Sequence, residues 1–393
     1  MAKKNEEKKV ITKENWVSSF SLIGKPKISD YTFKINETSE KSDWIYNSLN
    51  LGIDCGERFG TVYCEMMGGY SASKKNTIFA HGKNDDGTDN FKAKVEIDWD
   101  DRLNDKILDD VGNSCFITVG LEKTDKDKNY RRRFLSAYDA IKYIKECLTT
   151  DMVVNVYGTL KYSMYQDKVQ VRKTINRIEL YNAEPDKFCA TFKQSVLLDQ
   201  DSVNLKNVDT DKGIMYVDAR VLDYIKEYNG IEVRGQFPFM KTFEYDVKNY
   251  TKDQFKLVVE KLLKVKKNIT QINFNGLLIE GGAVAPASID ELPDDVREMV
   301  QIGAIPLEEA IKQCTANGKR ELRMILTSPD IRKSDDGVPS VQKFEERYTD
   351  DDLHLDYLYT DDASEMDDNS DSNPAPVAAP AEGDLSWMKE LLG

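Results

Sequence analysis

The stretch 151-DMVVNVYGTLKYSMYQDKVQVRKTINRIEL-180 is the part of the sequence that most clearly predicts a fold. Apolar and polar residues alternate along its first half, which is the period of a β-strand with one buried face. The pair Gln166-Asp167 separates this half from a second strand-like run, so we predict a β-hairpin with its turn there. Residues 136–150, SAYDAIKYIKECLTT, come directly before it and have a helical period, with Ser136 as the N-cap.

The same order of elements occurs twice along the chain. Before the first helix, the β-branched and aromatic segments 59–70 and 114–121 predict strands. After the hairpin, we predict strands over 188–198, 213–223 and 230–239, a helix over 251–267 that begins at Thr251, and a strand over 269–284. These two blocks are an internal repeat of plan, though not of residues.

This order of strands, a single helix and a closing hairpin resembles the OB-fold, a small Greek-key barrel used on oligonucleotides. Two such units followed by an acidic tail with an apolar tip resemble the single-stranded-DNA-binding proteins of bacteria and their phages. The resemblance implies a mainly β (α+β) fold with two OB-like Greek-key barrels in tandem, a small helical appendix and a disordered acidic C-terminal tail. The expected segments are a charged lead over 1–15, barrels over 16–185 and 186–286, the appendix over 287–332, the tail over 333–383 and a partner-docking tip over 384–393.

The acidity of the chain is concentrated in this tail. The 393 residues have a formal charge of −14, but thirteen acids and one base lie from Asp350 onward, so residues 1–349 carry only about −2. The chain lacks an apolar run of the roughly 18 residues that a transmembrane helix needs, and its charged N-terminus lacks a secretory signal. Six cysteines without CxxC pairs are typical of reduced thiols. We therefore expect a cytoplasmic protein, in the bacterial host if it is phage-encoded, without membrane contact.

Binding of single strands without sequence preference requires cations along the phosphates and aromatic faces for the bases. The segment 130-YRRRFLSAY-138 combines both, the outward face of the hairpin does so again, and 70-YSASKKNTIF-79 forms a third patch. The predicted nucleic-acid-binding residues are Tyr130, Arg131, Arg132, Arg133, Phe134, Tyr157, Lys161, Tyr165, Lys168, Arg172, Lys173, Arg177, Lys74 and Lys75.

Each patch also has a purely structural interpretation. The bases before Tyr130 alternate with acids, as in a solvated loop, and Tyr157 and Tyr165 could simply cover a sheet edge. The lysines of 264-KVKKN-268 predict the C-terminal end of a helix, where the helix dipole favours cations.

The sequence contains no recognisable catalytic motif. It lacks GxxxxGK[ST], HExxH and GxSxG, and it has only two histidines. Cys55, Cys64 and His81 are the only zinc candidates, whereas structural zinc sites prefer ligand pairs about two to four residues apart. We therefore expect no enzymatic activity, no metal and no cofactor.

The tail suggests two roles. An acidic leash tethered near a basic groove competes with phosphates at a high effective concentration. Its tip has an apolar cluster at helical spacing, which is typical of a helix that docks in a groove of a replication or recombination protein. A solubilising tail with a frayed end is the alternative. The predicted docking residues are Leu385, Trp387, Met388, Leu391 and Leu392.

The sequence thus predicts a non-enzymatic protein that binds and protects single-stranded DNA during DNA replication, recombination or repair. The alternative is a protein–protein scaffold or a virion assembly protein that uses OB-like domains. The first function requires Tyr130, Phe134, Tyr157 and Tyr165 to be exposed and to converge with Arg131–Arg133. A scaffold predicts that these aromatic residues are buried or dispersed.

Overall fold

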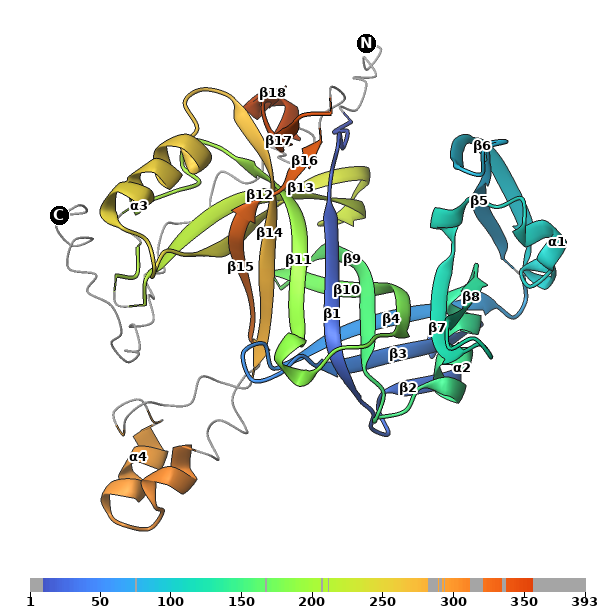
Figure 1. Ribbon diagram of the computed structural model, residues 1–393, viewed down its shortest axis with the longest axis horizontal. Helices are drawn as coiled ribbons and strands as arrows, with labels where there is room; N and C mark the ends of the chain where they lie inside the picture. The colour runs from blue at the N-terminus through green and yellow to red at the C-terminus, as the bar shows by residue number, and fades with distance from the viewer. Residues whose placement is uncertain are drawn as a thin grey trace. The chain divides into compact units, whose positions relative to one another are not determined.

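The computed structural model describes residues 10–74, 76–166, 168–205, 208–210, 212–281, 289, 292, 294–311, 321–333 and 337–355, and it is mainly β (Figure 1). Contacts divide the chain into two compact units. The N-terminal unit comprises Ser19–Lys161 and Arg172–Thr191, and the C-terminal unit draws its described residues from Met1–Ser18, Tyr162–Val171 and Phe192–Gly393. The units therefore interleave along the chain, whereas the boundaries expected from the sequence are sequential.

In the N-terminal unit, five strands form a closed order, β1-β3-β4-β10-β9 and back to β1. β1 is antiparallel to β3 and β9, β3 is antiparallel to β4, and β4 and β10 are parallel. Helix α2 lies in the chain between the third and fourth of these strands. The elements are β1 (Ser18–Lys27), β3 (Trp44–Asp54), β4 (Thr61–Ser71), α2 (Ala137–Cys147), β9 (Val154–Tyr165) and β10 (Lys168–Leu180).

The rest of this unit is inserted between the barrel strands. β2 (Phe33–Thr38) pairs with β3, and β7 (Ile117–Lys123) extends the sheet by pairing in parallel with β10 and antiparallel with β8 (Asn129–Phe134). β5 (Thr77–Lys83) and β6 (Asp89–Asp98) form a separate two-stranded sheet, with α1 (Asp105–Leu108) nearby in Figure 1. The insertion has its own small core, built on Ile97, Leu108, Val111 and Phe116.

The C-terminal unit repeats the closed order with different residues. Its strands run β11-β12-β13-β15-β14 and back to β11, and again the third and fifth strands along the chain, β13 and β15, are parallel. Helix α3 and a following π-helical turn again separate the third strand from the fourth. The elements are β11 (Cys189–Leu198), β12 (Ile214–Tyr228), β13 (Ile231–Asp246), α3 (Lys252–Val258), the π-helical turn Val259–Leu263, β14 (Ile269–Gly281), α4 (Asp294–Gln301), β15 (Glu321–Pro329), β16 (Ile331–Lys333), β17 (Pro339–Val341), β18 (Lys343–Tyr348) and α6 (Asp350–Leu353).

The local signals behind these elements are confirmed. Ser136 caps α2 by accepting a hydrogen bond from the Tyr138 N–H, and Thr251 and Gln254 form a capping box at the start of α3. Gln166 adopts a φ of +47° between β9 and β10, as a tight hairpin turn requires.

A glycine in the fourth strand of each barrel shows that the repeat extends to residues. A Cβ on Gly158 of β9 would lie 2.0 Å from the Thr174 carbonyl oxygen and 2.6 Å from the Phe20 ring. A Cβ on Gly276 of β14 would lie 2.6 Å from the Ile325 carbonyl oxygen and 2.3 Å from the Phe192 ring. In both cases the phenylalanine comes from the first strand and the carbonyl from the fifth. Glycine is therefore needed where these strands cross closely.

Two expectations about the C-terminal half are wrong. The predicted helical appendix contains α4, but residues 321–329 form strand β15 because they complete the closed strand order. The first part of the predicted disordered tail is ordered, because β18 pairs with β14 and α6 follows it. The tip 384–393 lies outside the described residues.

The N-terminal lead is also not merely a charged extension. Ile11 is buried in a cluster with Leu197, Leu222, Ile269, Tyr348, Leu353 and Leu355. The Tyr348 hydroxyl donates a hydrogen bond to the Thr12 carbonyl oxygen. The residues just before the acidic tail therefore close the core of the C-terminal unit.

We expect Leu353→Ala to destabilise the C-terminal unit by about 2–4 kcal/mol, because it empties a buried site of a large side chain. The midpoint of urea unfolding of the full-length protein, followed by tryptophan fluorescence, measures this. Leu257→Ala is the matched control, because Leu257 is 55% exposed and its loss removes little buried area. Equal midpoints for the two variants would contradict the assigned role of Leu353.

Candidate nucleic-acid interface

The three consecutive arginines lie on strand β8, so alternation sends them to two different sides. Arg132 faces helix α2, with its guanidinium carbon 4.6 Å from the centre of the Tyr143 ring. Phe134 is 5% exposed and packs 5.5 Å from the same ring, so its predicted stacking role is wrong. Phe134 is buried because α2 covers that side of the strand. Arg131 and Arg133 remain on the outer side.

Glu179 joins the outer side of β8 to the hairpin. The Arg131 Nε lies 2.8 Å from Glu179 Oε2, and the Arg177 Nε lies 3.7 Å from Glu179 Oε1. The Arg177 guanidinium carbon sits 5.3 Å from the centre of the Tyr157 ring. Arg131 of β8 and Arg177 of β10 thus share one carboxylate, and Tyr157 of β9 lies against Arg177. We call Tyr157, Arg177, Glu179, Arg131 and Arg133 the arginine–tyrosine face.

A glycine makes room for this arrangement. Gly120 lies on β7, between β10 and β8. A Cβ on Gly120 would be 3.1 Å from the Glu179 Cβ and 3.4 Å from the Arg131 Cγ. The pairing of Glu179 with Gly120 and of Arg177 with Thr118 sets which side chains meet. A Cβ at position 120 would therefore press on the Glu179 side chain, which pairs with Arg131.

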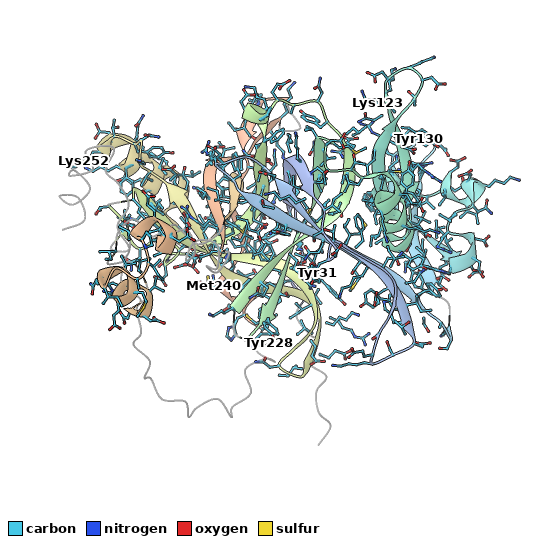
Figure 2. The ribbon with its side chains drawn as sticks, turned by 90° about the horizontal axis from the view of Figure 1, so that it is seen from below. Tyr31, Lys123, Tyr130, Tyr228, Met240 and Lys252 are labelled. Carbon is cyan, nitrogen blue, oxygen red and sulfur yellow. The ribbon has the colours of Figure 1, made fainter. Side chains whose placement is uncertain are left out.

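The face keeps a net positive charge and open aromatic surface. Of its three arginines, Arg131 and Arg177 pair with Glu179, and Arg133 lies 3.4 Å from the exposed Asp109. Tyr157 is 39% exposed, so its ring is accessible beside Arg177. Tyr130 is 49% exposed, and Figure 2 shows it with Lys123 pointing outward from β7 and β8. A cavity of about 310 Å³ adjoins the face and is lined by Leu103, Asp105, Leu108, Tyr130, Arg131, Arg132, Arg133 and Phe134.

Such a surface can bind a flexible polyanion with attached rings. Arginines supply donors for phosphate oxygens, and a tyrosine ring supplies a plane on which a base can stack. Exposed surface ion pairs contribute little to stability. A phosphate can therefore replace the exposed Asp109 as the partner of Arg133, whereas Glu179 is buried and stays as the partner of Arg131.

The other predicted residues are distributed as follows. Lys161 is exposed on β9 in the N-terminal unit. Tyr165, which is 64% exposed, and Lys168, which is also exposed, lie at the tip of the hairpin in the segment that clusters with the C-terminal unit. Arg172 lies 3.8 Å from Glu65. Lys173 is 5% exposed, so its predicted contact with nucleic acid is wrong: alternation turns it inward when Arg172 points outward. Lys74 is exposed, and Lys75 lies outside the described residues.

Glu179 is the residue that the sequence did not reveal. Glu179 lies two residues after Arg177 on β10. Its contact with Arg131 depends on the parallel pairing of β10 with β7, which brings together residues 48 positions apart. Parallel partners have no local sequence signal. Only the order of the strands could have identified this carboxylate.

Cys115 and His81 are in contact, but the geometry of this contact is not that of a catalytic pair. In the part of the chain that the structure describes, no three side chains of His, Cys, Asp or Glu could hold a metal ion. The Cys115 sulfur lies 3.2 Å from Nδ1 and 3.8 Å from Nε2 of His81. A hydrogen bond in the ring plane would place one nitrogen much farther from the sulfur, so the sulfur lies over the ring face. This geometry does not support proton transfer between them.

Comparisons with known proteins add little to this geometry. No family model matches the chain, and no curated protein matches it. Among solved structures, it is similar to a deletion mutant of the single-stranded DNA binding protein from Thermus aquaticus, with 10% identity and a TM-score of 0.30, over 67% of this chain and 87% of that one. At this TM-score the likeness assigns neither a fold nor a function to the chain. No helix among the described residues is long and apolar enough to cross a membrane.

Proposed function

We propose that this protein binds single-stranded DNA without catalysing a reaction, and that the arginine–tyrosine face is its main contact. The observation that supports this most directly is that Arg131 and Arg177 share Glu179 while Tyr157 lies against Arg177, so that three strands contribute to one face. The burial of Phe134 reduces the predicted set, and Arg132 is exposed but lies against Tyr143 on the other side of β8; Tyr130, Tyr157 and Tyr165 are exposed, as stacking requires.

Both units are, in this proposal, OB-like Greek-key barrels. Each has a closed five-strand order with a helix between the third and fourth strands and one parallel pair, β4 with β10 or β13 with β15. The shared glycine, phenylalanine and carbonyl contact supports a common plan. OB barrels bind oligonucleotides on the face of their second and third strands and on adjoining loops, and the hairpin turn at Gln166 is one of these loops.

The acidic C-terminal segment has two proposed roles. Its carboxylates compete with phosphates for cations of the body, and its tip, with Trp387 and Leu391, recruits proteins of DNA replication, recombination or repair. The charge supports the first role, because residues 356–393 hold ten acids and one base.

Fluorescence anisotropy of a labelled oligo(dT) tests the function. We expect saturable binding that weakens with salt, with a log–log slope of about −0.7 for each phosphate neutralised. A duplex of equal length should bind more weakly, because its bases are not free to stack. Absence of binding at low salt, both by the full-length protein and by a variant with the acids of 361–368 changed to amides, would contradict the proposal.

We expect Glu179→Gln to strengthen oligo(dT) binding about fivefold at low salt, because it removes about 1 kcal/mol of competition for the arginines while keeping a hydrogen-bond acceptor. The gain should fade at high salt. Glu184→Gln, an exposed acid of the same unit, is the control with the same change of charge. Weaker binding by Glu179→Gln would mean that the carboxylate positions the arginines instead of competing for them.

A further inference from the structure

A cleft in the C-terminal unit concentrates lysines that the body of the protein leaves largely unneutralised. It has a volume of about 420 Å³ and lies where the π-helical turn after α3 leads into β14, beside β18. We call it the lysine cleft. It is lined by Glu260, Lys261, Lys264, Val265, Lys266, Lys267, Asn268, Thr270, Lys343 and Glu345.

Of the five lysines that line the cleft, Lys343 has an ion-pair partner inside the fold. The Lys343 Nζ lies 2.8 Å from Glu345 Oε1 and donates a hydrogen bond to the Lys261 carbonyl oxygen at the end of the helix. Lys343 and, more weakly, Lys266 hold the pKa of Glu345 below its usual value. Among the described residues, none forms an ion pair within 4 Å with Lys264, Lys266 or Lys267. The cleft therefore has an excess of three positive charges.

We propose that the lysine cleft is the docking site of this chain's own acidic segment, and that it takes the carboxylates of 361-DDASEMDD-368. This stretch contains five acids in eight residues and no base. A single strand is the less favoured occupant, because the residues that line the cleft include no aromatic ring on which a base could stack.

The path of the chain favours an occupant in cis. A neighbouring cavity of about 210 Å³ shares Lys267 and Asn268 with the lysine cleft and is also lined by Asp350. The described chain ends soon after, at Leu355, and the six residues to Asp361 can span about 20 Å when extended. A tether of this length gives an effective concentration in the millimolar range, so even a weak charge contact is populated.

Docking would also set how strongly the tail regulates binding, a consequence that rests on the proposed function. Carboxylates held by Lys264, Lys266 and Lys267 are not available to the arginines of the N-terminal unit. The docking itself does not depend on nucleic acid and can be tested without it.

Zero-length cross-linking with a carbodiimide, followed by mass spectrometry, tests the docking on the full-length protein at low salt. We expect cross-links within one chain from the acids of 361–368 to Lys264, Lys266 and Lys267. The variant K264Q/K266Q/K267Q should reduce the total tail cross-linking about fivefold or more, and about 0.5 M salt should do the same. The control K226Q/K248Q/K256Q removes three exposed lysines of the same unit outside the cleft and should leave cross-linking unchanged.

Three outcomes would overturn the docking. Cross-links to Lys123 and Lys161 in place of the cleft would mean that the tail covers the N-terminal unit. Cross-links only between isotope-labelled and unlabelled copies would identify a second copy as the occupant. Protection of Lys264, Lys266 and Lys267 from acetylation by oligo(dT), but not by the tail, would identify a single strand. Loss of oligo(dT) binding by the full protein with the cleft cross-links intact would instead remove the proposed function and leave the docking in place.

Discussion

The triple variant R131A/Y157A/R177A is expected to bind oligo(dT) about 100-fold more weakly than the wild-type protein at moderate salt. Loss of one base stack costs about 1–3 kcal/mol, and loss of two phosphate contacts lowers the affinity further and reduces the salt slope by about 1.4. Because Tyr157 and Arg177 pack against each other, the single changes should not be additive. Fluorescence anisotropy over a range of salt concentrations measures both the affinity and the slope.

The variant R58A/F79A, which removes one exposed arginine and one exposed ring, is the control for this experiment. Arg58 is exposed and Phe79 is 76% exposed, both belong to the N-terminal unit, and neither is part of the arginine–tyrosine face. Tyr157→Phe should keep most of the affinity, because the ring and not the hydroxyl stacks. If the triple variant and the control lose affinity equally, the arginine–tyrosine face is not the binding surface.

Gly158→Ala and Gly276→Ala are expected to destabilise their own barrels by more than about 3 kcal/mol each. Overpacking in a core typically costs about 1–3 kcal/mol, and here the nearest atoms are backbone carbonyl oxygens and ring carbons that cannot rotate away. Gly158 and Gly276 belong to different units. Each change should therefore shift the unfolding transition of its own unit more than that of the other unit. Thermal unfolding followed by far-UV circular dichroism resolves these transitions.

Gly281→Ala is the control for both glycine variants. Gly281 ends β14, and a Cβ there meets no atom within 4 Å. The same substitution should therefore change the unfolding midpoint by little. If Gly158→Ala or Gly276→Ala behaves like Gly281→Ala, the close strand crossing at that position is relaxed in solution and the residue-level repeat loses its support.

The features that the sequence determined by itself are those with a local period or a local cap. Ser136 and Thr251 marked the starts of the two helices, because a capping side chain acts within one helical turn. The alternation in β9 placed Val156 and Leu160 inside and Tyr157 and Lys161 outside. Met164 has the same phase as the inward residues, but it is 38% exposed near the hairpin tip.

Only the tertiary structure decided which face of a strand is covered and which distant strands meet. Phe134 is buried because α2 packs on its side of β8, and residues 321–329 form a strand because β13 and β14 provide partners on both edges. Arg131 and Glu179 meet because β7 and β10 run parallel. Pairing between strands far apart in the chain follows from closing a barrel, and nothing in a local stretch of residues encodes the partner. The sequence thus supplied the chemical groups; the β9–β10 pairing brought Tyr157 to Arg177, and the extension of the sheet by β7 and β8 brought Arg131 to the same face.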